Sequence, residues 1–405
     1  MRSLLSLTCL TAVACTDCPP ASGDTGTIDT ASATTPAVAP TRCAEVDRTR
    51  DGASEVPTDA DEIMLSGVYR VSGTVTYDSD EEVTIEAGTV FLMEAGASVR
   101  FGWRSDPAAV FAEGTEEAPI LFCGTEDTPG HWLGVELLTG TRVDSTLSHV
   151  VIEDAGLDDM PALSVMQPVD LVGVQLFDNA ATGLYAESLG SGSSALVSTG
   201  NAVGLHLSNG ETVTALPEGD YTGNGDDAVL VTHLDNEDVV FHDRGVPYRQ
   251  TDERVVYGSA DGDEVTVTYE AGVTYQMCQD CSIVYGFRSD PAVVLVQGTA
   301  AAPVRFTSAQ PSPAPGDWDG LVLSTGTRSA SRIEHAEISY GGKRGGEDAN
   351  GANLIVSGGL GVVSNSHFAD AAGYGVWLER VEPGFELTGA TYEGNGEGDL
   401  YDATN

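Results

Sequence analysis

Two short motifs carry the residue types that acid–base or ligand-binding chemistry uses. The sequence RSDPA occurs at residues 104–108 and again at residues 288–292, so an arginine twice stands two residues before an aspartate. Lyases and glycosidases use a guanidinium beside carboxylates to hold hydroxyl or anionic groups and to transfer protons. The competing interpretation is an ion-paired turn that recurs with the fold, and the repetition favours it, so no catalytic residue is assigned. The candidate ligand-binding residues are Arg104, Asp106, Arg288 and Asp290.

Cysteine spacing provides a second candidate site. Cys278 and Cys281 form a CxxC pair, which is compatible with a local disulfide, a redox couple or half of a metal site. No βαβ pattern surrounds the pair and no further ligands lie nearby, so a local disulfide is favoured in an exported chain. The pairing among Cys18, Cys43 and Cys123 cannot be assigned from the sequence.

The remaining chemistry-bearing residues complete no known motif. The sequence contains no HExxH spacing and no GxSxG elbow. His149 and His335 recur at equivalent positions, where corner residues of the fold are expected. Acidic turns at residues 158–159, 224–227 and 261–264 offer oxygens to Ca²⁺, although none completes an EF-hand loop or a nonapeptide repeat. Solvated surface charge is the alternative, and no other cofactor is implied.

Composition restricts the partners. The chain has 405 residues, with 62 acidic against 18 basic side chains and a formal charge of −44. Such a negative field raises the free energy of approach to nucleic acid or to an anionic membrane surface, so neither is expected as a partner. Cations and neutral or basic ligands remain. The 41% of apolar residues suffices for a sizeable core.

The N-terminal residues predict export. Residues 1–14 form a leader whose apolar run is too short to span a membrane, which needs roughly 20 residues. The small residues before Cys15 resemble a lipobox, so Cys15 is the predicted lipidated residue. Cleavage by an ordinary signal peptidase is the alternative and would give a secreted protein. Residues 15–55 are predicted to hold this cysteine and a disordered tether rich in Thr, Ala, Ser and Pro. We expect an outer-membrane or cell-surface location, with membrane contact only through the lipid.

An internal repeat must position the candidate residues. The offset of 184 residues that relates the RSDPA motifs also carries EAG from residues 86–88 to 270–272. Two inserted residues then change the offset to 186, which aligns Trp132 with Trp318 and His149 with His335. Repetition on this scale predicts two homologous halves, residues 56–245 and 246–405.

Alternation inside the repeat predicts strands. Residues 91–93 (FLM) match residues 275–277 (YQM), so the outer positions stay large and apolar while the middle one becomes polar. Period-two behaviour indicates strands with one face on a core and the other near solvent. Turn, Asn or Asp, glycine and a short apolar strand also recur about every 22 residues, at residues 177–185, 200–206 and 223–229. This spacing is typical of a coil whose turns stack on one another.

The order of these segments resembles the right-handed parallel β-helix repeats of bacterial surface proteins, which are related in fold to the pectin lyases. The resemblance implies an all-β, right-handed parallel β-helix solenoid built from the two halves. It supplies architecture rather than chemistry, since similar proteins are often exported and have no assigned activity. The segments that carry it are residues 298–308, 316–321 and 333–342, and more loosely residues 114–122, 132–137 and 147–156.

The expected function is therefore that of a non-enzymatic exported surface lipoprotein that is structural or binds a glycan or extracellular matrix. The competing function is a polysaccharide lyase or glycoside hydrolase of the pectin-lyase-like fold. An enzyme should gather two or three carboxylates and an arginine in one non-repeated cleft, whereas a scaffold should spread its acids evenly over the coils. A pure spacer should have no ligand at all.

Overall fold

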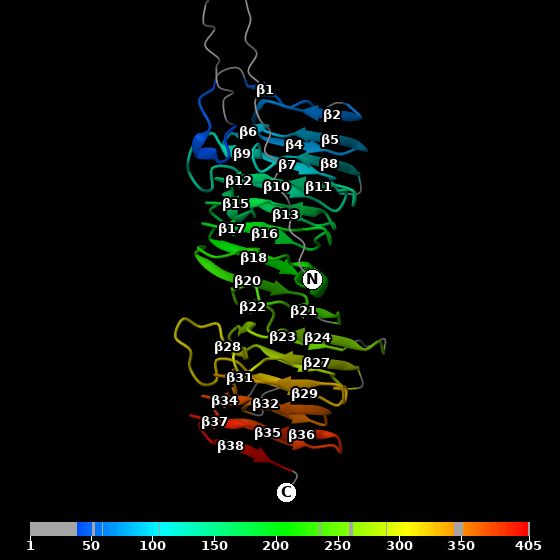
Figure 1. Ribbon diagram of the computed structural model, residues 1–405, viewed down its shortest axis with the longest axis vertical. Coiled ribbons are helices and arrows are strands. Elements are labelled where there is room, and N and C mark those ends of the chain that lie inside the picture. Colours follow the sequence, from blue (N-terminus) through cyan, green and yellow to red (C-terminus); the bar gives the residue numbers. More distant parts are fainter. Residues whose placement is uncertain are drawn as a thin grey trace, which may run out of the picture. The chain divides into compact units, whose positions relative to one another are not determined.

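Short parallel strands wind the chain into stacked coils (Figure 1). The computed structural model describes residues 39–403 apart from residues 51, 52, 59, 105, 235, 259–261, 289 and 344–350. The strands pair in parallel with the equivalent strand of the next coil, so backbone hydrogen bonds run from coil to coil. These ladders confirm an all-β parallel β-helix.

One sheet continues through the whole described β-helix. We call it sheet C, and neighbouring strands in its order are hydrogen-bonded. Its strands are β4 (Thr74–Tyr77), β7 (Ser98–Phe101), β10 (Gly134–Leu137), β13 (Leu163–Val165), β16 (Thr182–Ala186), β18 (Val203–Ser208), β20 (Asp226–Thr232), β22 (Tyr248–Gln250), β25 (Thr274–Met277), β28 (Val304–Ser308), β31 (Ala336–Ser339), β34 (His367–Ala369) and β37 (Thr391–Glu393).

Two further sheets complete the coils of the N-terminal part. Sheet A contains β1 (Ser54–Glu55), β3 (Val68–Val71), β6 (Val90–Met93), β9 (Ile120–Gly124), β12 (Val150–Glu153), β15 (Gln175–Phe177), β17 (Leu196–Thr199) and β19 (Gly219–Asp220). Sheet B contains β2 (Glu62–Leu65), β5 (Glu81–Glu86), β8 (Ala108–Glu113), β11 (Thr146–Ser148) and β14 (Asp170–Val172). The short 3₁₀ turns are η1 (Cys43–Glu45) and η2 (Leu157–Asp159).

Different sheets complete the coils of the C-terminal part. Sheet D contains β21 (Val239–Phe241), β24 (Val265–Tyr269), β27 (Ala292–Gln297), β30 (Arg332–Glu334), β33 (Gly361–Ser364) and β36 (Phe385–Thr388). Sheet E contains β23 (Arg254–Tyr257), β26 (Ser282–Tyr285), β29 (Gly320–Leu323), β32 (Ala352–Ser357), β35 (Tyr374–Arg380) and β38 (Gly398–Asp402). Helix α1 (Gly210–Ala215) lies between β18 and β19, and we call residues 210–237, which precede the first strand of sheet D, the seam.

Equivalent strands of the sequence repeat occupy different sheets. In the N-terminal part, β7 and β10 belong to sheet C, whereas their counterparts β26 and β29 belong to sheet E. Sheet C instead receives β25 and β28, the counterparts of β6 and β9 of sheet A. The segment that forms a strand of sheet A in the first repeat therefore forms a strand of sheet C in the second, and each following strand is displaced by one sheet in the same way. Residues 39–405 group as one unit by their contacts, and the division into two halves at residue 245 remains a prediction.

The interior is apolar, as the alternation predicted. Phe91, Phe122, Tyr275 and Phe306 are all buried. The rings of Phe91 and Phe122 stack with their centroids 4.4 Å apart, in adjacent coils. Such inward ladders remove large apolar side chains from water in a narrow core.

The outward face of sheet A differs from the prediction that it lies near solvent. Leu92 and Leu121 point away from the main core, yet both are fully buried in a second apolar cluster with Cys43 and Cys123. The physical reason is the packing of residues 39–50 over this face, described below. No helix of the described residues is long and apolar enough to cross a membrane.

Candidate functional site

The RSDPA motifs form the turns that follow β7 and β26. Arg104 and Arg288 are exposed and adopt the left-handed backbone region, with φ of 60° and 58°. The backbone carbonyl of each accepts a hydrogen bond from a threonine hydroxyl of the next coil, Thr139 at 2.9 Å in the first case and Thr325 in the second. The two turns are thus built by equivalent contacts.

The ion-paired turn that the sequence suggested is not formed. In the part of the chain that the structure describes, the side chains of Asp106 and Asp290 make no ion pair or hydrogen bond, and neither guanidinium pairs with a carboxylate. Arg104 lies instead over the ring of Trp103, with 5.6 Å from Cζ to the ring centroid, and Arg288 lies over Phe287 at 4.9 Å. Sequence reasoning named the arginines but missed their aromatic partners.

The CxxC pair lies in the turn between β25 and β26. Cys278 and Cys281 are joined by a disulfide with 5.3 Å between their Cα atoms, and Cys281 is fully buried. Asp280 between them pairs with Lys343, the one lysine of the sequence. The contacts place the pair in a closed local turn rather than beside a substrate cleft.

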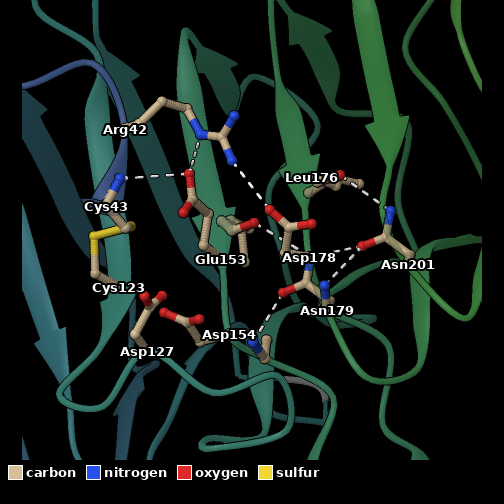
Figure 2. A network of polar contacts seen from close by, with 12 residues as sticks. Arg42, Cys43, Cys123, Asp127, Glu153, Asp154, Leu176, Asp178, Asn179 and Asn201 are labelled. Carbon is tan, nitrogen blue, oxygen red and sulfur yellow. Dashed lines mark hydrogen bonds and ion pairs between the residues drawn. A yellow bond between two sulfur atoms is a disulfide. The ribbon is translucent and has the colours of Figure 1, made fainter. Parts of the chain in front are cut away.

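Residues 39–50 form a strap over the outward face of sheet A (Figure 2). A disulfide joins Cys43 to Cys123 of β9, across 80 residues of sequence and 5.5 Å between Cα atoms. This pairing was left open by the sequence. The strap lies inside the stretch predicted to be a disordered tether; its apolar contacts and the cross-link hold it in place. The predicted lipidated residue, Cys15, lies outside the described residues.

Two arginines fasten the strap. Arg42 pairs with Glu153 and, at 3.2 Å, with Asp178, and its guanidinium lies 3.9 Å from the centroid of the Phe177 ring. Arg48 pairs with Asp154 at 2.7 Å. Burial raises the pKa of the Asp154 carboxyl, and the nearby positive charge of Arg48 opposes that rise. The strap therefore covers apolar surface and pairs with two acids, Glu153 at the end of β12 and Asp154 directly after it. These contacts give the strap a structural role.

Asparagine side chains continue this network along the coils (Figure 2). Asn179 Oδ1 accepts from the backbone N–H of Ala155 at 2.8 Å, and Asn201 Oδ1 accepts from the backbone N–H of Asn179 at 3.1 Å. Asn224 repeats the arrangement one coil further, at 3.0 Å from the N–H of Asn201. The turns that the sequence marked by Asn thus form a buried ladder, which satisfies backbone groups that the strands leave free.

A cleft opens at the seam. It encloses about 950 Å³, within the size range of sites for small ligands. Helix α1 forms one wall of the cleft. Asn209 caps the start of this helix, where its Oδ1 accepts a hydrogen bond from the N–H of Thr212 at 2.9 Å. We call this the seam cleft. Its lining residues are Ser191, Glu211, Thr214, Ala215, Leu216, Asn236, Glu237, Asp238, Arg244, Asp263, Glu264 and Val265.

Three of the five carboxylates in the seam cleft already have structural partners. Glu237 accepts from the N–H of Gly210 at 2.9 Å, Asp238 accepts from the N–H of Thr266 at 2.6 Å, and Glu264 lies 3.8 Å from Arg328. Glu211 and Asp263 are exposed and make no ion pair or side-chain hydrogen bond within the described chain.

The arginine of the seam cleft is held by backbone. Arg244 is half-buried and donates from Nη2 and Nε to the carbonyl of Leu216, at 2.7 and 3.1 Å. Apolar atoms of Ala215, Leu216 and Val265 complete the walls. The arrangement offers free acceptors, one fixed cation and apolar surface, which suits a hydroxyl-bearing ligand.

Sequence reasoning did not find this cleft. Most of its residues lie between 211 and 244, a stretch that the alignment leaves unmatched, and helix α1 is too short to give a helical pattern. The end of the 22-residue spacing after residues 223–229 was the one available signal. The cleft also meets the condition set for an enzyme, since carboxylates and an arginine converge at a non-repeated place.

Metal-binding residues do not cluster in the described chain. No group of three or more His, Cys, Asp or Glu side chains there is arranged to hold an ion. Residue 261 of one acidic turn lies outside the described residues. His149 and His335 adopt left-handed φ values of 47° and 48°, which places both at corners of the coil.

Residues 238–354 match the family described as pectate-lyase like beta helix domain. This stretch covers β21 through the first part of β32, and its parallel sheets are those expected for such a domain. Neither the curated proteins nor the solved structures contain a significant match to the chain.

Proposed function

We propose that this β-helix protein is a non-enzymatic, exported surface lipoprotein that binds a neutral or basic glycan in the seam cleft. The observation that carries the proposal is the cleft itself, where free carboxylates, one fixed arginine and apolar walls face the same space. Carboxylates accept hydrogen bonds from sugar hydroxyls, and apolar walls contact the faces of sugar rings.

The negative charge of the seam cleft and of the whole chain favours neutral and basic ligands over polyanions. Five acidic side chains and one arginine line the cleft of a chain whose formal charge is −44. A polyanionic chain entering this site would meet repulsion at short range, whereas a neutral or amino sugar would not. We therefore place neutral and basic glycans, such as those of an extracellular matrix, ahead of acidic ones.

Existing bonds argue for binding over catalysis. Glu237 and Asp238 hold backbone N–H groups of α1 and β24, and Arg244 holds a carbonyl at the end of α1. These groups build the walls of the cleft, and moving them toward a reacting bond would break those contacts. Glu211 and Asp263 remain as acceptors for a ligand.

The proposed export and lipid anchoring are supported by the N-terminal sequence and the long-range disulfide, not by the seam cleft. The leader and Cys15 precede the strap, and the Cys43–Cys123 disulfide is of the kind that persists in an oxidising compartment. Replacing Cys15 by serine should shift the protein from the membrane fraction to the soluble fraction of exported material. Unchanged membrane association of that variant would remove the lipid anchor from the proposal.

A polysaccharide lyase or glycoside hydrolase is the second candidate. The convergence of carboxylates with Arg244 in one non-repeated cleft favours it, since two acids and a cation are the minimum such chemistry needs. It predicts that a bound glycan is also cleaved.

One experiment separates the candidates. The full chain carrying Cys15→Ser is screened on a glycan array, and each ligand found is incubated and analysed for cleavage products. We expect binding without products, and a loss of at least about tenfold in affinity in the Glu211→Gln, Asp263→Asn double variant. The matched control is Glu116→Gln with Glu117→Gln, which makes the same charge change on an exposed turn outside the cleft. Products that disappear in the cleft variant would establish the enzyme, and absence of any ligand would leave a spacer.

A further inference from the structure

In each of two turns, an aromatic ring lies close to the guanidiniums of two arginines. Trp103, which is 38% exposed, has Cζ of Arg100 at 5.3 Å and Cζ of Arg104 at 5.6 Å from its ring centroid. Phe287 has Cζ of Arg254 at 4.8 Å and Cζ of Arg288 at 4.9 Å. We call the first arrangement the Trp103 clamp and the second the Phe287 clamp. Neither shares a residue with the seam cleft.

The two clamps are built from different strands. Trp103 and Arg104 correspond to Phe287 and Arg288 through the offset of 184 residues, but the residue that corresponds to Arg100 is a valine. In the second repeat the other arginine is Arg254, which lies on β23 of the preceding coil. The arrangement of one ring and two guanidiniums is therefore retained although the sequence that supplies it has changed. Phe287 is half-buried and packs against the apolar cluster that contains Val284 and Val322, so the ring itself has a packing role and the guanidinium edges are the groups left for a ligand.

The outer arginine of each clamp has no carboxylate. Acidic side chains outnumber basic ones by 62 to 18, and most arginines of the described chain pair with an acid or a carbonyl. Arg104 and Arg288 make neither kind of contact there, although an aspartate follows each by two residues. Stacking on a ring leaves the N–H edge of a guanidinium free to bind an anion in two-pronged fashion.

Backbone hydrogen bonds hold the described residues of each clamp. The N–H of Asp106 donates to the carbonyl of Trp103 at 3.1 Å, and the N–H of Asp290 donates to the carbonyl of Phe287 at 3.1 Å. Each outer arginine also holds a left-handed φ that non-glycine residues rarely adopt and that costs free energy. These contacts hold the backbone of Trp103 and Arg104, and of Phe287 and Arg288, and a side chain presented from a held position loses little entropy when a ligand binds.

We propose that the Trp103 clamp and the Phe287 clamp are two independent sites for a small sugar that bears a single carboxylate or sulfate. The oxyanion would bind the N–H edge of Arg104 or Arg288, and the carbon atoms of the sugar would contact the exposed edge of the aromatic ring beside that guanidinium. A polyanion is disfavoured, because its remaining charges would meet the field of a chain with a formal charge of −44. The clamps follow β7 and β26, which belong to different sheets, so each binds its own ligand.

Tryptophan fluorescence tests the first site. Trp132 and Trp318 are fully buried and Trp377 is half-buried against Tyr401, so quenching by a small solute reports mainly on Trp103. Glucuronic acid and glucose 6-sulfate are titrated into the full chain carrying Cys15→Ser, with glucose as the neutral comparison. We expect saturable quenching by either acidic sugar, or by both if the clamp does not distinguish carboxylate from sulfate, and none by glucose.

Substitutions assign the two sites. Arg104→Gln should weaken the quenching affinity about tenfold or more, whereas Arg50→Gln, an exposed arginine outside both clamps, should leave it unchanged. In a Trp103→Phe chain, Phe287→Trp moves the fluorescent ring to the second clamp, where Arg288→Gln but not Arg104→Gln should weaken binding. The cleft variant with Glu211→Gln and Asp263→Asn should retain both responses.

Three results would overturn the proposal. They are equal quenching by glucose, an equal effect of Arg50→Gln and Arg104→Gln, and quenching by neither acidic sugar in a chain whose circular dichroism is native. The first would indicate stacking without charge recognition, and the second a general field effect. The third would leave the clamps as structural turns.

Discussion

The two repeats make the same local contacts at different positions around the coil. Trp132 Nε1 donates to the carbonyl of Glu153 at 2.8 Å, and Trp318 Nε1 donates to that of Ser339 at 2.9 Å. Yet the strand that follows Trp132 belongs to sheet C and the one that follows Trp318 belongs to sheet E. The residues of the repeat therefore fix the local packing but not the sheet that each strand joins.

The two parts of the β-helix are also stabilised differently. The N-terminal part, residues 54–209, has the strap, a long-range disulfide and most of the asparagine ladder. The C-terminal part, residues 238–403, has a local disulfide and an interior rich in tyrosine, where the hydroxyls of Tyr269 and Tyr285 lie 3.0 Å apart. A thin core can thus be reinforced from outside by cross-links or from inside by polar aromatic residues.

Alkaline pH should produce the largest difference in stability between the two parts, because it should destabilise the C-terminal part more than the N-terminal part. Burial raises the pKa of Tyr248, Tyr269, Tyr275 and Tyr285 in the C-terminal part, and that of Tyr77 in the N-terminal part. Their stabilising contribution is complete below about pH 10, the ordinary tyrosine pKa, and falls as the pH rises above it because only the unfolded state ionises. At pH 11 the expected loss is about 1.4 kcal/mol per buried tyrosine.

Limited proteolysis with mass spectrometry would follow this loss. Cleavage should appear in residues 238–403 before residues 54–209 as the pH rises from 9 to 11.5. Tyr269→Phe with Tyr285→Phe should delay it. Simultaneous cleavage of both parts would show that the tyrosines do not set the difference.

Removal of the long-range disulfide should be the next largest effect. Cys43 and Cys123 are 80 residues apart, and closing a loop of that length restricts the unfolded chain by about 4.5 kcal/mol. Cys43→Ser with Cys123→Ser should lower the free energy of unfolding of the N-terminal part by about that amount. Urea denaturation measures the loss, and hydrogen exchange of β9 shows where in the structure it occurs.

The local disulfide provides the matched control. Cys278 and Cys281 are three residues apart, so their removal should cost about 2 kcal/mol and act on β25 and β26. Equal losses in the two serine variants would contradict the loop-length argument.

The asparagine ladder should contribute less than the long-range disulfide. Asn201→Ala removes the acceptor for the N–H of Asn179 and the donor to the carbonyl of Leu176, which costs about 2–3 kcal/mol. Asn395 in the last coils makes the same kinds of bond to Ala371 and Phe368 but is less buried. Asn395→Ala should therefore cost about half as much by urea denaturation, and a larger loss there would reverse the comparison.

Ionic strength should have the smallest effect and act on both parts. Reducing salt from about 1 M to about 0.01 M lengthens the screening distance from about 3 to about 30 Å, so repulsion among the acidic side chains rises and Tm falls by a few degrees. A chelator added at constant ionic strength is the control that separates screening from cation binding. A fall in Tm with chelator alone would indicate a bound cation.

Period-two alternation predicted the strands, and the 22-residue spacing together with the resemblance to β-helix repeats predicted the β-helix. Residues such as Phe91 and Tyr275 keep their size between repeats because they fill the core, so the pattern reports directly on burial. The turns after β7 and β26 were located for the same reason, since RSDPA recurs unchanged.

Features that depend on contacts between distant segments were missed. Nothing near Cys43 in sequence indicates Cys123 as its partner, because the pairing follows from the strap lying on sheet A. Helix α1 has six residues, too few for a periodic pattern, and the seam cleft depends on it. The repeat alignment also gave no sign that equivalent strands join different sheets, because the alternation of a strand reports its burial and not its neighbours.

The Cys43–Cys123 cross-link also determines how mechanical load would travel. Tension applied through the residues before Cys43 passes across the disulfide into β9, and the backbone between the two cysteines carries none of it. β9 is flanked by β6 and β12, whereas β1 lies at the edge of sheet A and pairs on one side only. Pulling on the N-terminus would therefore shear an interior strand held on both sides instead of peeling the first strand from the edge. Resistance to detachment under flow would then depend on the oxidation state of one cysteine pair.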